Sequence, residues 1–119
     1  MASQIGCQMY TLREFTKTPP EIAKTLAKVK KIGYDAVQMS GHGPIDAKGL
    51  AKILQNEGLM CAATHVPLAR MKDEPQKLID DHQLWGCQYT AIGGHFQGKD
   101  RDFVTKDWFD FTSSYNEIA

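Results

Sequence analysis

The sequence has 119 residues with 14 basic and 14 acidic side chains, so its formal net charge is zero. A neutral chain has no bulk attraction to nucleic acid or anionic membrane, and no apolar run approaches the ~20 residues of a membrane-spanning helix. The first residues lack the basic and apolar regions of a signal peptide. The cysteines Cys7, Cys61 and Cys87 form no C-x-x-C pair. We therefore expect one domain, reduced buried thiols and a cytoplasmic location.

Short apolar strands are expected to alternate with amphipathic helices along the whole chain. The expected strands are 5–10, 36–39, 59–63 and 89–92, and their apolar character is typical of strands that are buried on both faces. Gly33, Gly58 and Gly86 each follow a helical pattern and precede one of these strands. Glycine is common at that position because it adopts the left-handed conformation that ends many helices.

The helix starts carry recognisable capping residues. Thr18 is expected to cap the first helix, with Pro19 in its first turn and Glu21 completing a capping box. Asp46 is expected to cap the second helix.

The third helix is expected to begin at Asp73, with Gln76 at the capping-box position, and the fourth near Thr105. Apolar residues at helical spacing predict the buried faces of all four helices. They are Ile22, Leu26, Val29, Ile32, Leu50, Ile53, Leu54, Leu78, Ile79, Trp85, Trp108, Phe111, Tyr115 and Ile118.

The order βαβαβαβα implies a parallel sheet with right-handed crossovers. An open doubly wound sheet and part of a barrel both fit this order. The nucleotide-binding open sheet loses support because no G-x-G-x-x-G follows the first strand and no P-loop motif occurs. The expected fold class is α/β, with four βα units and one parallel sheet in a single domain, 1–119. No further strand follows the fourth helix, so we expect a truncated chain.

Candidate substrate-binding residues lie at or just after the C-terminal ends of the expected strands, where parallel α/β folds gather their functional groups. These candidates are His65, Arg13, Tyr10, Gln38, His95 and His42.

The histidines differ in how strongly their position indicates a site. His65 ends a buried strand ahead of Pro67, so its ring should face the barrel mouth, where it could hydrogen-bond a hydroxyl group. The alternative is a buried histidine bonded to backbone. His42 is either a ligand contact or an ordinary loop residue. His95 follows two glycines that would let a ligand approach, and His82 is expected to be a partly exposed helix residue.

The remaining candidates each have two interpretations. Arg13 binds a phosphate or carboxylate, or it is a solvated loop residue. Gln38 hydrogen-bonds polyol oxygens, or it is a barrel-interior amide satisfied by its neighbours. Tyr10 is expected to form part of the pocket wall. No residue is assigned as catalytic, and no nucleophile elbow is present.

No local metal motif is present. Histidines on three strands could converge on Zn²⁺ or Mn²⁺, but no carboxylate lies beside them, so we predict no metal site. The basic cluster Lys28, Lys30 and Lys31 falls on the polar side of the first helix and reads as a solvated face.

Six segments carry a likeness to a known family. They are 5–13 (IGCQMYTLR), 32–39 (IGYDAVQM), 57–67 (EGLMCAATHVP), 84–89 (LWGCQY), 105–108 and 116–119. The first three resemble the first, second and third strands of the sugar phosphate isomerase/epimerase family, the xylose-isomerase-like TIM barrels. Segment 84–89 resembles the approach to that family's fourth strand, and the last two segments resemble the helix after it. The resemblance covers the N-terminal half of the family only and implies four βα units that form half of a (βα)8 TIM barrel.

This resemblance implies a metal-dependent isomerisation or epimerisation of a sugar or sugar phosphate, by proton transfer next to a carbonyl. It implies that His65 touches substrate and that the full-length family uses Mn²⁺, Mg²⁺ or Zn²⁺. The family's metal-binding carboxylates come mainly from strands after the fourth, and its second strand often has an acid where Gln38 stands. We therefore expect no tightly bound metal and no activity from this chain alone.

Two other interpretations remain. The chain could be a non-catalytic, self-associating half-barrel module, and we expect a homodimer or higher oligomer through exposed strand edges. It could also be a relative of DNA-repair endonuclease IV, although the neutral charge and the lack of a basic groove count against that class.

Overall fold

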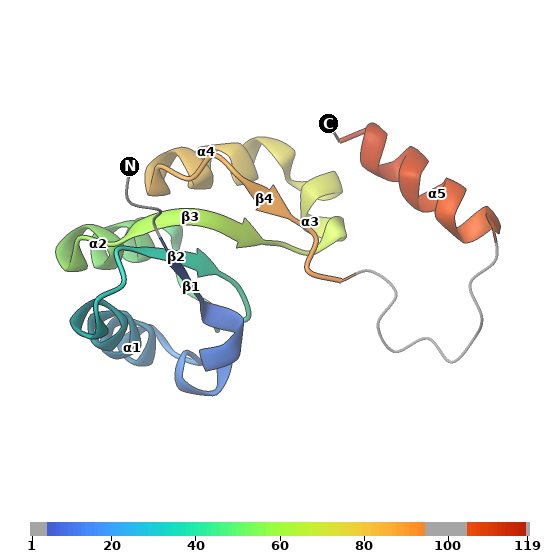
Figure 1. Cartoon of the computed structure of the whole chain (residues 1–119). Helices are drawn as coiled ribbons and strands as arrows, with labels where there is room; N and C mark the ends of the chain where they lie inside the picture. The colour runs from blue at the N-terminus through green and yellow to red at the C-terminus, as the bar shows by residue number, and fades with distance from the viewer. Residues whose placement is uncertain (1–4, 95–104, 119) are drawn as a thin grey trace.

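The computed structural model describes residues 5–94 and 105–118. Ten elements occur in this part of the chain (Figure 1). They are β1 (Gly6–Gln8), the 3-10 helix η1 (Met9–Phe15), α1 (Pro19–Ile32), β2 (Ala36–Met39), α2 (Ala47–Glu57), β3 (Met60–His65), α3 (Leu68–Asp73), α4 (Pro75–Trp85), β4 (Thr90–Ala91) and α5 (Thr105–Asn116).

The four strands form one sheet in the order β1-β2-β3-β4, and every neighbouring pair is parallel. The α/β class and the four strand–helix units predicted from the sequence are therefore confirmed. The carboxyl ends of all the strands lie at the same edge of the sheet, as parallel pairing requires. Functional groups are expected at that edge.

The main core lies between one face of the sheet and the helices. It consists of Met9, Ile22, Leu26, Val29, Val37, Met39, Leu50, Leu54, Leu59, Cys61 and Cys87. Each such side chain contributes ~1.5–3 kcal/mol by leaving water. The opposite face is largely open, because Met60 is 43% exposed. The expectation of strands buried on both faces holds for β2, where only Gln38 is not fully buried, and is wrong for β1, β3 and β4.

An extra residue interrupts the regular pairing of β3 with β2. Val37 pairs with Cys61, but the next residue of β2, Gln38, pairs with Ala63, so Ala62 has no partner on β2. This irregularity is a β-bulge. Successive strand residues alternate between faces, so the bulge reverses the facing of every later residue in β3.

The predicted helix caps of α1 and α2 are confirmed. The Glu21 carboxylate accepts a hydrogen bond from the Thr18 backbone N–H at 3.0 Å. The Asp46 carboxylate accepts one from the Gly49 N–H at 2.8 Å. The three predicted glycines all end helices in the left-handed conformation, as proposed for Gly33, Gly58 and Gly86.

The third helix was predicted wrongly. Asp73 ends α3 instead of starting a helix, and α4 begins at Pro75 after Glu74. Proline has no N–H to donate within a helix, which favours a break ahead of it. The Gln76 side chain donates to Asp80 at 2.9 Å and makes no capping box.

Strand lengths and some buried faces also differ from expectation. Residues 9 and 10 belong to η1 instead of β1, β3 continues to His65, and β4 has only two residues. Four residues expected on buried helix faces are exposed. They are Ile32 (75%), Ile79 (50%), Trp108 (54%) and Tyr115 (39%).

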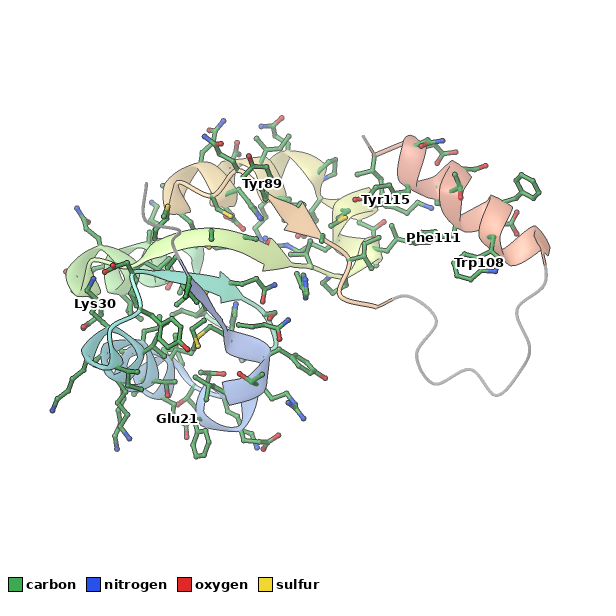
Figure 2. The ribbon with its side chains drawn as sticks, in the orientation of Figure 1. Glu21, Lys30, Tyr89, Trp108, Phe111 and Tyr115 are labelled. Atoms are coloured by element: carbon green, nitrogen blue, oxygen red, sulfur yellow. The ribbon has the colours of Figure 1, made fainter. Side chains whose placement is uncertain are left out.

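A smaller core lies beside β4. It contains Val66, Met71 and Leu78, with Ile92 and Ile118 packed against it. Figure 2 shows Trp108, Phe111 and Tyr115 along the same side of α5, as the helical spacing predicted. In the described part of the chain, no helix combines the length and apolar character that crossing a membrane requires.

Candidate functional site

The bulge in β3 turns Thr64 toward the helices, where it meets a buried histidine. The Thr64 hydroxyl lies 2.7 Å from Nε2 of His82, and Nδ1 of His82 lies 2.8 Å from the Leu78 carbonyl oxygen. A carbonyl can only accept, so Nδ1 carries the proton and donates. In the neutral ring, Nε2 then accepts from Thr64. His82 is only 8% exposed, which corrects its predicted place as a partly exposed residue.

The same reversal turns His65 to the opposite, open face of the sheet. Gly93 follows β4 and lies directly beside His65, since a Cβ at Gly93 would stand 3.0 Å from Nδ1 of the imidazole. A cavity of about 370 Å³ opens here at the carboxyl ends of the strands. We call it the mouth cavity. Its lining residues are Gln8, Tyr10, Ser40, Gly41, His65, Val66, Pro67, Gly93 and Gly94.

Tyr10 lines the mouth cavity, and Arg13 contacts the Tyr10 ring. The Arg13 guanidinium carbon lies 4.4 Å from the Tyr10 ring centroid, and Nη1 donates to the Tyr10 carbonyl oxygen at 2.9 Å. Gly41 leaves room for this ring, because a Cβ there would lie 2.6 Å from Tyr10 Cδ2. Arg13 itself does not line the mouth cavity.

Gln38 lies beside the mouth cavity without lining it. Its Oε1 accepts a hydrogen bond from the Ser40 hydroxyl at 2.8 Å. Its Nε2 is buried and, within residues 5–94 and 105–118, has no hydrogen-bond partner. An unsatisfied buried donor costs about 1–3 kcal/mol. A hydrogen-bond acceptor placed next to Gln38 Nε2 would therefore remove this cost.

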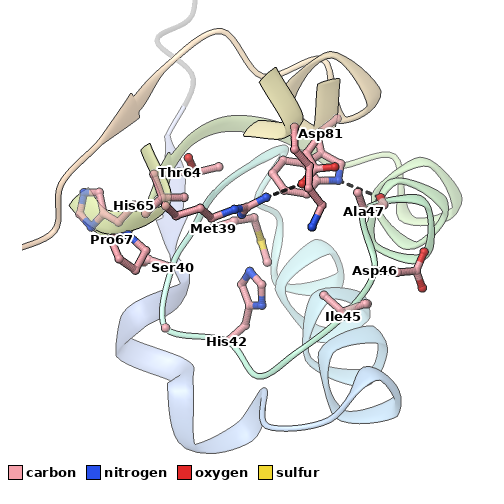
Figure 3. Close-up of a pocket in the computed structure, with 15 residues that line it drawn as sticks. Met39, Ser40, His42, Ile45, Asp46, Ala47, Thr64, His65, Pro67 and Asp81 are labelled. Carbon is pink, nitrogen blue, oxygen red and sulfur yellow. Dashed lines mark hydrogen bonds and ion pairs between the residues drawn. The ribbon is translucent and has the colours of Figure 1, made fainter. Parts of the chain in front are cut away.

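A second cavity of about 540 Å³ adjoins the mouth cavity and shares with it Ser40, Gly41, His65, Val66 and Pro67. Figure 3 shows His42 pointing into this second cavity. The His42 Nδ1 lies 2.8 Å from the Gly43 carbonyl oxygen, which can only accept, so Nδ1 donates to it.

The far wall of the second cavity is an ion pair and an indole. The Arg70 guanidinium contacts the Asp81 carboxylate, and the Trp85 indole N–H donates to the Ala47 carbonyl at 2.9 Å. Because Asp81 neutralises Arg70, this cavity does not present a free guanidinium to an anion.

The structure thus separates the predicted residues into groups. His65 and Tyr10 meet in the mouth cavity, His42 lines only the second cavity, and Arg13 and Gln38 support the walls. His95 lies outside the described residues. Gln8 and Ser40 were not predicted, although both are polar residues at a strand end. Their position at the carboxyl end of a strand was the feature of the sequence from which they could have been predicted.

The mouth residues do not fit a divalent metal. They offer one imidazole together with amide and hydroxyl oxygens, whereas Mn²⁺ and Mg²⁺ sites are built mainly from carboxylates. No group of three or more histidine, cysteine, aspartate or glutamate side chains is suitably placed in the described part of the chain.

Solved structures that share this fold include the following two. The chain is similar to L-ribulose 3-epimerase, with a TM-score of 0.71 and 18% identity over 99% of this chain and 45% of that one. It is also similar to a sugar phosphate isomerase/epimerase from Parabacteroides distasonis, with a TM-score of 0.62 and 20% identity over 98% of this chain and 49% of that one. No protein-family model and no curated protein matches the sequence.

These likenesses confirm the predicted fold, half of a (βα)8 TIM barrel. The chain spans about half the length of the solved structures that it matches.

Substituting Gly41 should disturb the mouth cavity more than substituting a comparable glycine elsewhere. Gly41 and Gly58 have similar positive φ values, +68° and +61°. A Cβ at Gly41 would clash with the Tyr10 ring, whereas a Cβ at Gly58 would have no atom within 4 Å. Gly58→Ala should cost about 1–2 kcal/mol from the left-handed backbone alone. Gly41→Ala should cost more and should displace the Tyr10 ring. Urea unfolding and the Tyr10 ring signals in NMR spectra measure both effects. Equal destabilisation with unmoved Tyr10 signals would contradict this account.

Proposed function

We propose that this chain provides a substrate-binding half of a sugar isomerase/epimerase barrel, which acts on a sugar or sugar phosphate by proton transfer next to a carbonyl. The single observation that carries the proposal is the mouth cavity, which brings His65 and Gln8 together at the carboxyl edge of a sheet of this barrel type.

The chemistry of the mouth cavity suits a sugar. A sugar hydroxyl group both donates and accepts hydrogen bonds. The Gln8 amide, the Ser40 hydroxyl and the His65 imidazole each offer a hydrogen-bonding group that can pair with it. Tyr10 adds an aromatic wall of the kind that covers an apolar sugar face. Gly93 and Gly94 let a ligand come close to the backbone.

For a complete barrel, we propose that the reaction depends on a divalent metal ion. A divalent ion such as Mn²⁺, Mg²⁺ or Zn²⁺ would stabilise the charge that develops beside the carbonyl. The described residues do not supply its ligands, and no group among them is assigned to move the proton. We therefore propose binding without turnover for the chain alone, in a cytoplasmic setting without nucleic-acid or membrane partners.

Sugar binding can be tested through the histidine ring signals of the chain in NMR spectra. Adding L-ribulose should shift the His65 signals in a saturable way and should leave buried His82 unchanged. Gly93→Ala should weaken the shift about tenfold or more, because its Cβ would press on the His65 ring. Gly86→Ala is the matched control, since nothing lies within 4 Å of its Cβ position. No shift at His65 at high sugar concentration would refute the binding proposal.

Self-association is a second candidate function, favoured by the two edges of the sheet. Within the described residues, β1 pairs only with β2 and β4 pairs only with β3, so both outer edges carry unpaired backbone groups. Large exposed apolar side chains accompany each edge. They are Ile5, Phe15 and Ile32 near β1 and α1, and Ile79, Leu84 and Tyr89 near α4 and β4.

An apolar groove lies between η1 and α1, the two elements that follow β1. It has a volume of about 390 Å³, and its apolar lining includes Leu12, Phe15, Val29 and Ile32. A twofold axis along the barrel would place the β4 edge of one copy against the β1 edge of the other. Two copies would then supply about the length of one barrel of the matched type.

Association should therefore depend on apolar residues at the β1 edge. Sedimentation should show a dimer at micromolar concentration, and Ile32→Lys should convert it to a folded monomer, because a charge would be buried at the seam. Lys52→Ala on the exposed side of α2 is the control and should remain a dimer. A compact wild-type monomer at high concentration would reject self-association and would leave the sugar-binding proposal standing.

A further inference from the structure

Two buried cysteines lie together beneath the helices. Cys61 on β3 is 2% exposed, Cys87 just ahead of β4 is 6% exposed, and both belong to the main core. Cys87 is also close enough to contribute to raising the pKa of the Cys61 thiol. Neither side chain lines the mouth cavity, so the proposed sugar binding does not use them.

The strand register explains why these thiols meet. Thr64 of β3 pairs with Thr90 of β4, and each cysteine stands three residues ahead of its member of that pair. Cys87 precedes β4, which begins at Thr90. Neighbouring strands run about 4.8 Å apart where Thr64 pairs with Thr90, and a disulfide requires roughly 4.4–6.8 Å between Cα atoms.

Each thiol is also held by backbone. The Cys61 thiol donates to the Ala63 carbonyl at 3.7 Å, and the Cys87 thiol donates to the Tyr89 carbonyl at 3.3 Å. Each sulfur atom is therefore held in the main core, close to the point where β3 and β4 begin to pair.

We propose that Cys61 and Cys87 form a redox site, at which a small organic disulfide oxidises them to an intramolecular disulfide that tethers β4 to β3. One protein thiolate attacks the small disulfide and releases one small thiol. The second protein thiolate attacks the resulting mixed disulfide and releases the other. Two protein thiols lose two protons and two electrons, and the small disulfide becomes two thiols.

The fold controls access to this reaction. Burial, together with the neighbouring Cys87, raises the pKa of Cys61 to about 12. Very little thiolate is then present at pH 7, and only the thiolate attacks. Oxidation therefore proceeds when the segment ahead of β4 opens. That opening is within reach because β4 joins the sheet through two residues only, Thr90 and Ala91.

The tether would act on the mouth cavity. Ala91 pairs with His65, and Gly93 lies against the His65 ring. Linking β4 to β3 just ahead of this point holds the wall of the mouth cavity in place, so oxidation would restrict how that wall moves.

The test incubates the native chain with oxidised glutathione and follows intact mass, peptide linkage and amide hydrogen exchange. We expect a loss of about 2 Da with Cys61 linked to Cys87, and a rate that rises about tenfold from pH 7 to pH 8. Amide exchange over 88–92 should slow in the oxidised chain. Cys7→Ser keeps the pair and should behave like the wild type, whereas Cys61→Ser should not lose this mass.

Three results would overturn the proposal. The first is a native chain that keeps three free thiols while the same chain oxidises in urea. The second is a disulfide that involves Cys7. The third is amide exchange over 88–92 that does not slow after oxidation, which would show that the disulfide does not restrict β4. Peptide mapping of the wild type decides the linkage even where Cys61→Ser does not fold.

Discussion

The β-bulge at Ala62 decides which side chains of β3 reach the helices and which reach the open face of the sheet. Before it, Cys61 belongs to the core, and after it the alternation is reversed. Without the extra residue, His65 would point under α4 and Thr64 would point into the mouth cavity. The position of the candidate site therefore depends on a local irregularity in one strand.

The buried polar contacts of Thr64 stabilise this arrangement. Its hydroxyl lies 2.7 Å from His82 and 2.8 Å from the Thr90 hydroxyl, and the other nitrogen of His82 bonds the Leu78 carbonyl. All of these groups find partners, whereas any one left alone would cost about 1–3 kcal/mol. The network links α4, β3 and β4, so it also supports the wall beside His65.

Much of the fold could be predicted because its signals are local. Gly58 and Gly86 mark helix ends through a backbone conformation that glycine favours, and Asp46 marks a helix start through one hydrogen bond. The alternation of strands and helices then implies a parallel sheet. None of these features needs knowledge of distant contacts, which is why they can be read from the chain alone.

The features that could not be predicted are set by tertiary contacts. A bulge at Ala62 leaves no mark in an apolar run, and His82 is indistinguishable from a surface histidine until Thr64 is known to face it. The open face of the sheet also escaped prediction, since a short apolar strand reads the same whether one or both faces are covered. Of the candidate site, the strand-end placement of His65 was predictable, but the separation of His42 into another cavity was not.

The most direct test of this account is which neighbours the two histidine rings have in solution, measured by nuclear Overhauser contacts. The account predicts contacts from the His82 ring to the Thr64 methyl group and from the His65 ring to the Gly93 α-protons. Contacts from the His65 ring to side chains of α4, with Thr64 facing the solvent, would show that β3 has no bulge. That result would contradict the central claim.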